Sequence, residues 1–212
     1  MKIVVMGGSF NPPTIAHLIS LQTAMDSIGA EKGIFVPSSH AYVKRKMKKT
    51  GHPEEVFSEE LRLAMLKAMA EDDTRISVND LEYHRTEKGY TYETMEALQN
   101  IYPNDTLYFL AGGDKISIFP RWHRIREFLE RFHIIVMKRD DEDATQEIEK
   151  YSLLQQHKDM FHVTETPNTL NGISSSAVRE SLRNGENGAE KMLHPRVSAL
   201  LQQNSKKEGA FS

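Results

Sequence analysis

The residues best suited to chemistry lie close to the N-terminus. Gly7 and Gly8 follow the apolar run 3–6 and lead through a polar turn to Thr14 and His17. Glycines let a backbone approach a bulky anion, and the first turn of a helix offers unpaired N–H groups. With Thr14 as the N-cap, His17 falls in that first turn, where facing phosphates would keep its imidazole protonated. This stretch therefore predicts a phosphate-binding loop.

The spacing of these glycines is neither the dinucleotide fingerprint G-x-G-x-x-G nor a P-loop, since no Gly-Lys-Ser/Thr follows. It resembles the first signature of the nucleotidylyltransferase superfamily, G-[TS]-F-[DN]-P-x-[HT]-x-x-H. The matching positions are Gly8, Ser9, Phe10, Asn11, Pro12, Thr14 and His17. Many members carry H-x-G-H, but the T-x-x-H form also occurs, in mononucleotide and pantetheine-phosphate adenylyltransferases. The alternative is an ordinary strand–turn–helix with a surface histidine.

A second candidate phosphate site is the stretch 173–179, Ile-Ser-Ser-Ser-Ala-Val-Arg. If Ser175 is the N-cap, Arg179 lies one turn further along the same face of the helix. Helix N–H groups, serine hydroxyls and a guanidinium would then form a triphosphate clamp. The stretch resembles the family's second signature, I-S-[ST]-[ST]-x-x-R. A serine-capped helix with a surface arginine is the alternative.

A basic stretch over 38–49, which we expect to be a loop, carries five cationic residues. They are Lys44, Arg45, Lys46, Lys48 and Lys49. Such a cluster can steer a polyphosphate toward a site, although a solvated loop has the same composition. The segment 40–44 resembles the family's loop that contacts the nucleotide substrate and the ATP phosphates, and Lys44 is its favoured residue.

Two further stretches could recognise a ring and a sugar. In 89–94 (Gly-Tyr-Thr-Tyr-Glu-Thr), Thr91 is expected to cap a helix behind Tyr90. The stretch resembles the S-Y-T-x-D-T loop of nicotinate mononucleotide adenylyltransferases, which cradles the pyridine ring. A plain helix cap is the alternative.

The other stretch is Ala-Gly-Gly-Asp at 111–114, followed by Pro120, Arg121 and Trp122. An aspartate after a strand suits a ribose hydroxyl. The lone tryptophan could stack on a pyridinium ring, or could simply pack in the core. G-x-D followed by P-x-W again resembles the mononucleotide adenylyltransferases.

Composition limits the other classes of function. The chain has 212 residues, of which 39% are hydrophobic, and a net charge of −3. Such a charge gives no general basic field for nucleic acid or anionic lipid. Because cysteine is absent, disulfides and a thiolate nucleophile are excluded. We expect no signal peptide, no transmembrane segment and a cytoplasmic protein.

Apolar strand-like runs alternate with helical patterns along the chain. Strands are expected over 3–6, 33–37, 75–78, 106–111, 133–137 and 161–163, and helices over 14–28, 58–70, 92–101, 125–131, 145–156, 175–183 and 195–203. This alternation predicts an α/β fold, a Rossmann-like doubly wound parallel sheet of the nucleotidylyltransferase type, in one domain. The domain is expected to cover 1–203, with a polar C-terminal tail over 204–212.

The resemblance covers most of the chain and implies a nicotinate or nicotinamide mononucleotide adenylyltransferase. The mononucleotide phosphate would attack the α-phosphorus of ATP, with Mg²⁺ on the ATP phosphates, to form NAD or deamido-NAD and pyrophosphate. The stretch 89–94 favours nicotinate, whereas Asn11 and Thr14 look more like the nicotinamide-using form. The alternatives are another nucleotidylyltransferase, such as a pantetheine-phosphate adenylyltransferase or a cytidylyltransferase, and a non-catalytic nucleotide-binding regulator.

The resemblance also implies roles for single residues. The catalytic set is His17, Arg179, Thr14 and Lys44. ATP would be bound by Gly8, Ser9, Phe10, His17, Gly112, Asp114, Ile173, Ser174, Ser175 and Arg179. The mononucleotide would be bound by Asn11, Lys44, Tyr90, Thr91 and Trp122. No side chain is assigned to a metal, and a homo-oligomer is left open.

Overall fold

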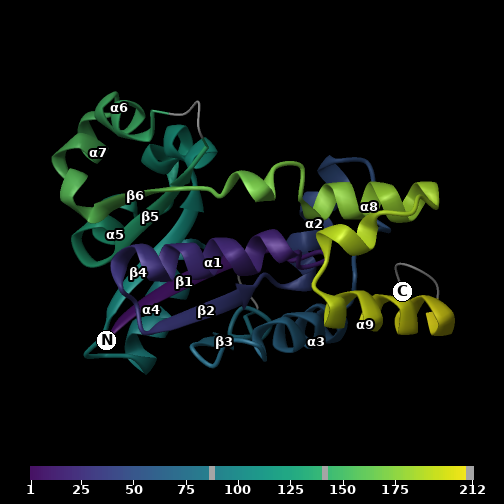
Figure 1. Cartoon of the computed structure of the whole chain (residues 1–212). Coiled ribbons are helices and arrows are strands. Elements are labelled where there is room, and N and C mark those ends of the chain that lie inside the picture. Colours follow the sequence, from purple (N-terminus) through teal and green to yellow (C-terminus); the bar gives the residue numbers. More distant parts are fainter. Residues whose placement is uncertain (86–88, 140–142, 209–212) are drawn as a thin grey trace. The chain divides into compact units, whose positions relative to one another are not determined.

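Six strands form one sheet in the order β3-β2-β1-β4-β5-β6 in the computed structural model, which describes residues 1–85, 89–139 and 143–208 (Figure 1). The strands are β1 (Lys2–Gly8), β2 (Lys32–Pro37), β3 (Ile76–Val78), β4 (Thr106–Gly112), β5 (His133–Lys138) and β6 (Phe161–Glu165). The pairs β1–β4, β4–β5 and β5–β6 are parallel. The predicted doubly wound parallel sheet is therefore confirmed, with the reversal of strand order at β1.

Helices alternate with the strands along the chain, as the sequence pattern predicts, and the last two helices of the described segments follow β6. They are α1 (Ile15–Ile28), α2 (His40–Lys49), α3 (Glu59–Ala70), α4 (Thr91–Ile101), α5 (Ile125–Arg131), α6 (Ala144–Glu149), α7 (Ser152–Gln156), α8 (Ser175–Asn184) and α9 (Pro195–Glu208). The described residues also form the 3₁₀ helices η1 (Gly113–Arg121), η2 (Lys158–Met160), η3 (Asn168–Leu170) and η4 (Ala189–Met192). Within these described segments, no helix is long and apolar enough to cross a membrane.

The largest departure from prediction is the basic stretch 38–49, which is helix α2 and not a loop. Ser39 caps it by accepting a hydrogen bond from Tyr42 N, and Val43 and Met47 are buried one turn apart. These two side chains form an apolar cluster with Val56. Lysine and arginine are good helix formers, so a two-residue apolar face is enough to fold a stretch whose charges suggested a loop.

Two smaller differences concern helix ends. The single polar helix expected over 145–156 is split into α6 and α7, because α6 ends at Glu149 with Lys150 as its C-cap. Helix α9 continues past Gln203 to Glu208, so part of the predicted tail is helical. The tail residues 209–212 lie outside the described residues.

The chain divides into two compact units, each assembled from three segments. Unit 1 comprises Met1–Gly7, Ser20–Ile34 and Gly89–Thr169, and unit 2 comprises Gly8–Ile19, Phe35–Lys88 and Leu170–Ser212. No single cut in the sequence separates them. A single domain over 1–203 stays a prediction for this interleaved chain.

Each unit has its own apolar core. In unit 1, the parallel strands β4 and β5 carry side chains with at most 9% exposure, such as Phe109 and Val136. In unit 2, α3 packs against α9 and β3, and Met65, Leu66 and Val197 are fully buried. The polar residues discussed below are positioned by these two cores.

Candidate active site

The first signature loop, in unit 2, is shaped by the buried ring of Phe10. The backbone of this residue has a positive φ of 43°, which is uncommon for residues other than glycine. Its ring makes edge contacts with the rings of His17 and Phe35, at centroid distances of 5.0 and 5.4 Å. A Cβ at Gly8 would lie 3.1 Å from the same ring. A side chain at position 8 would therefore crowd the Phe10 ring, which is a structural reason for glycine there in addition to the predicted approach of an anion.

His17 is the third residue of α1, and its imidazole turns back onto the residue that precedes the helix. Nδ1 accepts a hydrogen bond from Thr14 N at 2.9 Å and lies 2.9 Å from Thr14 Oγ1. A third-position glutamate does the same in a capping box, where it satisfies an N–H that the helix leaves free. Thr14 thus stands at the helix start as predicted, and His17 fixes its main chain.

The hydrogen bond from Thr14 also determines the proton on His17. A main-chain N–H can only donate, so Nδ1 must be unprotonated and the ring proton must be on Nε2. Burial lowers the pKa of His17 to about 4, and the charge of Lys46 adds to this effect. The protonation of His17 that is expected opposite facing phosphates stays a prediction. His17 is neutral at pH 7 and offers one donor, Nε2–H.

The second signature begins helix α8, and its cap is one residue earlier than predicted. Ser174 is the N-cap, and its Oγ accepts from Ala177 N at 3.1 Å. Ser175 instead donates its hydroxyl to Pro12 O at 2.7 Å, which ties the start of α8 to the first loop. The main-chain N–H of Ile173 donates to Leu170 O, so the predicted adenine contact of Ile173 would have to use its carbonyl.

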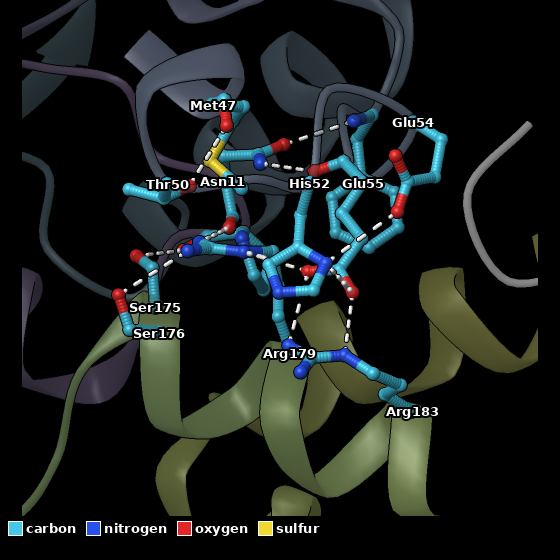
Figure 2. Close-up of polar contacts among 12 residues, drawn as sticks. Asn11, Met47, Thr50, His52, Glu54, Glu55, Ser175, Ser176, Arg179 and Arg183 are labelled. Carbon is cyan, nitrogen blue, oxygen red and sulfur yellow. Dashed lines mark hydrogen bonds and ion pairs between the residues drawn. The ribbon is translucent and has the colours of Figure 1, made fainter.

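Arg179 also reaches the first loop, and it is only 8% exposed. Nη1 donates to Asn11 O at 2.7 Å, and Nη2 donates to Ser176 Oγ at 3.2 Å (Figure 2). The two signatures, distant in sequence, are thus in contact through Arg179–Asn11 and Ser175–Pro12. The contact of Arg179 with phosphate remains a prediction.

Asn11 has a structural role that the sequence did not suggest. It is 1% exposed, its Nδ2 donates to Glu55 O at 2.7 Å and its Oδ1 accepts from Phe57 N at 2.9 Å (Figure 2). Both ends of the carboxamide are therefore engaged by the main chain of the segment before α3. The contact of Asn11 with the mononucleotide stays a prediction.

Lys44 is the lysine predicted to contact phosphate, but Lys46 is the one that lies near the first loop in the structure. Lys46 Nζ donates to Ser9 Oγ at 3.5 Å, and its charge reaches His17. Lys44 is an exposed residue of the same helix. The two side chains cannot share one face, because residues two apart on a helix point in different directions.

Arg62 is the residue that sequence reasoning missed most clearly. It is fully buried, and its guanidinium donates to three carbonyls, Ser9 O at 2.9 Å, Ser38 O at 2.8 Å and Phe57 O at 3.3 Å. A signal existed in the sequence. The buried positions of α3 are Arg62, Met65, Leu66, Met69 and Ala70. Arg62 therefore lies on the apolar face of an amphipathic helix, where a charge needs a specific partner.

In unit 1, two of the predicted ring-binding residues, Tyr90 and Thr91, lie at the start of α4. Tyr90, and not Thr91, is the capping residue, and no side chain caps the helix; Thr91 is its first residue. Tyr90 is 42% exposed and stacks on His123 with a centroid distance of 4.4 Å. His123 Nε2 lies 3.2 Å from Glu93 Oε1. The exposed Tyr90–His123 pair offers aromatic surface, and its use by a ligand stays a prediction.

Trp122 is half-buried and follows η1. Its ring makes edge contacts with Phe109, Phe119 and Phe128 at centroid distances of 5.7, 4.7 and 6.1 Å. These three contacts agree with the alternative that the buried part of the ring packs in the core. Stacking of the remaining part on a pyridine ring stays a prediction.

The Gly112–Asp114 stretch joins β4 to η1. The Asp114 carboxylate folds back over Gly112, where an added Cβ would lie 2.6 Å from Oδ1, and it forms an ion pair with Lys115. A cavity of about 410 Å³ lies beside it. Its polar lining residues are Asp114, Ser117, Asp143, Gln146, Glu147 and Lys150. This cavity could take a hydroxyl-rich group, as the predicted ribose contact of Asp114 requires.

A metal ion finds little support among the side chains of the described segments. The group there whose ligand atoms could converge on an ion is His52, Glu54 and Glu55. Glu55 is already paired with Arg183 at 2.6 Å and lies 3.6 Å from Arg179. An added cation would be repelled by both guanidinium groups.

Comparison with known proteins gives a consistent result. The family model described as Cytidylyltransferase-like matches residues 5–181. A "Probable nicotinate-nucleotide adenylyltransferase" of Lachnoclostridium phytofermentans is 31% identical over 87% of this chain and 88% of the relative. The protein of that name from Caldicellulosiruptor bescii is 30% identical and covers 100% of this chain and 99% of the relative.

Solved structures support the same fold. The Plasmodium falciparum nicotinic acid mononucleotide adenylyltransferase, described in complexes with APC and with NaAD, has a TM-score of 0.75 to this chain. Its sequence identity is 21%, and the match covers 100% of this chain and 98% of the other. At that identity the match concerns the fold.

Proposed function

The chain belongs to the cytidylyltransferase-like family, and we propose that it is an adenylyltransferase that joins nicotinate mononucleotide to ATP. One observation carries the proposal. The two signature stretches meet in unit 2, through Arg179 Nη1 to Asn11 O and Ser175 Oγ to Pro12 O. The relatives that cover nearly the whole chain are named nicotinate-nucleotide adenylyltransferases, which supports nicotinate as the ring.

In the proposed reaction, a phosphate oxygen of the mononucleotide attacks the α-phosphorus of ATP. A new P–O bond forms as the bond to the β-phosphate oxygen breaks, and pyrophosphate leaves with that electron pair. No side chain acts as a nucleophile. The protein contributes positioning and stabilisation of charge, as is general for phosphoryl transfer.

His17 is proposed to donate its Nε2–H to an oxygen that gains charge in this step. The donor is fixed in advance, because Thr14 N holds Nδ1 as an acceptor. A pre-oriented neutral donor loses no free energy to reorganisation when the charge develops. Gly8, Ser9, Phe10 and Thr14 would shape the loop for the phosphates.

The remaining residues are proposed to bind the rest of the two substrates. Arg179, Ser174 and Ser175 would face the β- and γ-phosphates, with Ile173 at the adenine and Lys46 favoured over Lys44 at the phosphates. In unit 1, Gly112 and Asp114 would contact a ribose, and Tyr90, Thr91 and Trp122 would contact the pyridine ring. Mg²⁺ would enter with ATP as the substrate complex, bound by phosphate and water oxygens.

The test is pyrophosphate release from Mg-ATP with three acceptors in parallel: nicotinate mononucleotide, nicotinamide mononucleotide and phosphopantetheine. We expect release with nicotinate mononucleotide and a lower kcat/KM with the amide. The control is His17→Ala, which should slow release with every acceptor by roughly 10²–10³. Release only with phosphopantetheine would replace the proposed acceptor. ATP binding without any release would indicate a nucleotide-binding regulator.

A further inference from the structure

Two arginines of α8 share the buried carboxylate of Glu55, and they share it unequally. Glu55 is 3% exposed. Its Oε1 accepts from Arg183 Nε at 2.6 Å, and its Oε2 accepts from Arg183 Nη2 at 3.3 Å. Arg179 Nε forms a longer ion pair with Oε2, at 3.6 Å, which is beyond hydrogen-bonding distance. Figure 2 shows the Arg183 guanidinium against this carboxylate and the end of the Arg179 guanidinium directed toward Asn11 and Ser176. Arg183 therefore holds Glu55 more closely than Arg179 does.

Arg179 is left with an incompletely matched charge. Its Nη1 and Nη2 donate to Asn11 O and Ser176 Oγ, but its buried Nε–H has no hydrogen-bond acceptor. Buried donors of charged groups are normally satisfied, because leaving them free is costly. Burial lowers the pKa of Arg179, and the charge of Arg183 adds to this effect, although the nearby Glu55 carboxylate opposes it in part.

The carboxylate is close enough to supply the missing acceptor. A shift of less than 1 Å would bring Oε2 from 3.6 Å to ordinary hydrogen-bonding distance of Arg179 Nε, about 2.9 Å. The bidentate contact with Arg183 opposes this shift, because each Glu55 oxygen already accepts from Arg183. A carboxylate bound to Arg179 would compete with any anionic ligand for the same guanidinium.

We propose that Arg183 is a positioning residue that keeps Glu55 off Arg179 and so leaves the charge of Arg179 available to the phosphates of a nucleotide. The proposal rests on the proposed function, in which Arg179 faces the ATP phosphates. It assigns to Arg183 an effect on ATP binding without contact between Arg183 and ATP. Glu55 keeps its place through its main chain, since Glu55 O accepts from Asn11 Nδ2 at 2.7 Å.

The first experiment measures binding of ATP and of inorganic tripolyphosphate by calorimetry. Arg183→Gln frees Glu55 to bind Arg179, and we expect the Kd of both ligands to rise roughly tenfold, the effect of one lost charge-assisted hydrogen bond. Adding Glu55→Gln to that variant removes the competing carboxylate and should restore the original Kd. Arg183→Lys keeps one cation near Glu55 and should give an intermediate Kd.

Arg196 provides the matched control. Its side chain is 46% exposed, against 42% for Arg183, and it pairs with Glu71 at 3.0 Å on the surface of unit 2. Arg196→Gln removes the same charge outside the cluster and should leave both Kd values within twofold. An equal rise in Kd for Arg196→Gln and Arg183→Gln would show a long-range charge effect and would overturn the proposal.

The second experiment observes Arg179 directly by ¹H–¹⁵N NMR of arginine Nε–H groups, with the Arg179 signal assigned by its loss in Arg179→Lys. In Arg183→Gln, this signal should move downfield and exchange more slowly, because Nε–H gains an acceptor. An unchanged signal, or a double variant that binds as weakly as Arg183→Gln, would overturn the proposal.

Arg179→Gln separates this inference from the proposed function. If Arg179→Gln binds ATP as tightly as the unsubstituted chain, the assignment of Arg179 to ATP is wrong and the inference fails with it. If Arg179→Gln weakens binding while Arg183→Gln does not, only the inference fails. Thermal unfolding checks that each variant is folded. If Arg183→Gln does not fold, Arg183→Lys replaces it in the binding and NMR experiments.

Discussion

Thr14 N donates a hydrogen bond to His17 Nδ1 at 2.9 Å, and this contact makes the imidazole a donor through Nε2. A second proton would bind to Nδ1 and make this nitrogen a donor. It would then face the N–H of Thr14, which is also a donor, and the hydrogen bond would be lost. The histidine of the first signature therefore acts, in the proposed reaction, as a neutral hydrogen-bond donor.

His17→Ala should lower kcat for pyrophosphate release by roughly 10²–10³, the usual effect of removing one pre-oriented donor to a developing charge. Thermal unfolding should show that the variant is folded, because the half-buried ring contributes one cap contact and an edge contact with Phe10. A kcat within a few-fold of the unsubstituted enzyme would contradict the role given to His17.

Stability should fall with acidification through the titration of His17. Its folded pKa is lowered to about 4 from an ordinary value of 6.5, so the unfolded chain binds the proton first as pH falls. The part of the free energy of unfolding that depends on neutral His17 is fully present above pH 6.5. It is lost between pH 6.5 and 4, by up to about 3 kcal/mol. Urea unfolding at pH 7.5, 6, 5 and 4 measures it. His17→Asn should remove this part of the pH dependence, and an identical pH profile for both proteins would exclude His17 as its source.

Arg62 should be a main determinant of the stability of the first loop. Replacing it with Met leaves three carbonyls, Ser9 O, Ser38 O and the buried Phe57 O, without this donor. We expect a loss of at least about 3 kcal/mol in the free energy of unfolding, measured in urea. Arg75→Met is the control, because Arg75 forms an exposed ion pair with Asp73, and it should cost less than about 1 kcal/mol. Equal losses would contradict the role of Arg62.

Sequence patterns located the strands well because apolar runs and turn residues are local signals. They located α2 poorly, because its burial rests on Val43 and Met47 alone among many charges. The loop–helix contacts Arg179–Asn11 and Ser175–Pro12 agree with the two signatures. The burial of Arg62 could have been inferred from its place on the apolar face of α3. The partners of Arg62 and of Glu55 could not, because a charged residue shows its partner only when the chain is folded.

Trp122 should affect the binding of the mononucleotide and the stability of unit 1 by separable mechanisms. Trp122→Phe keeps an aromatic ring against Phe109, Phe119 and Phe128 but weakens a cation–π contact, so KM for nicotinate mononucleotide should rise about fivefold while KM for ATP stays constant. Trp122→Ala should also lower the melting temperature. Steady-state kinetics with each substrate varied in turn provide the measurement. A parallel rise in both KM values would contradict stacking on the pyridine ring.

Lys46 and Lys44 offer a matched pair on one helix. Both lysines are exposed, but Lys46 Nζ reaches Ser9 Oγ at 3.5 Å, whereas the side chain of Lys44 is directed to another part of the helix surface. Lys46→Ala should raise KM for ATP about fivefold, and the rise should shrink in 0.5 M salt, where charge interactions are screened. Lys44→Ala should change KM less than twofold. Because both substitutions remove one lysine from α2 and introduce a good helix former, their difference isolates position from net charge. A larger effect for Lys44→Ala would restore the choice made from the sequence.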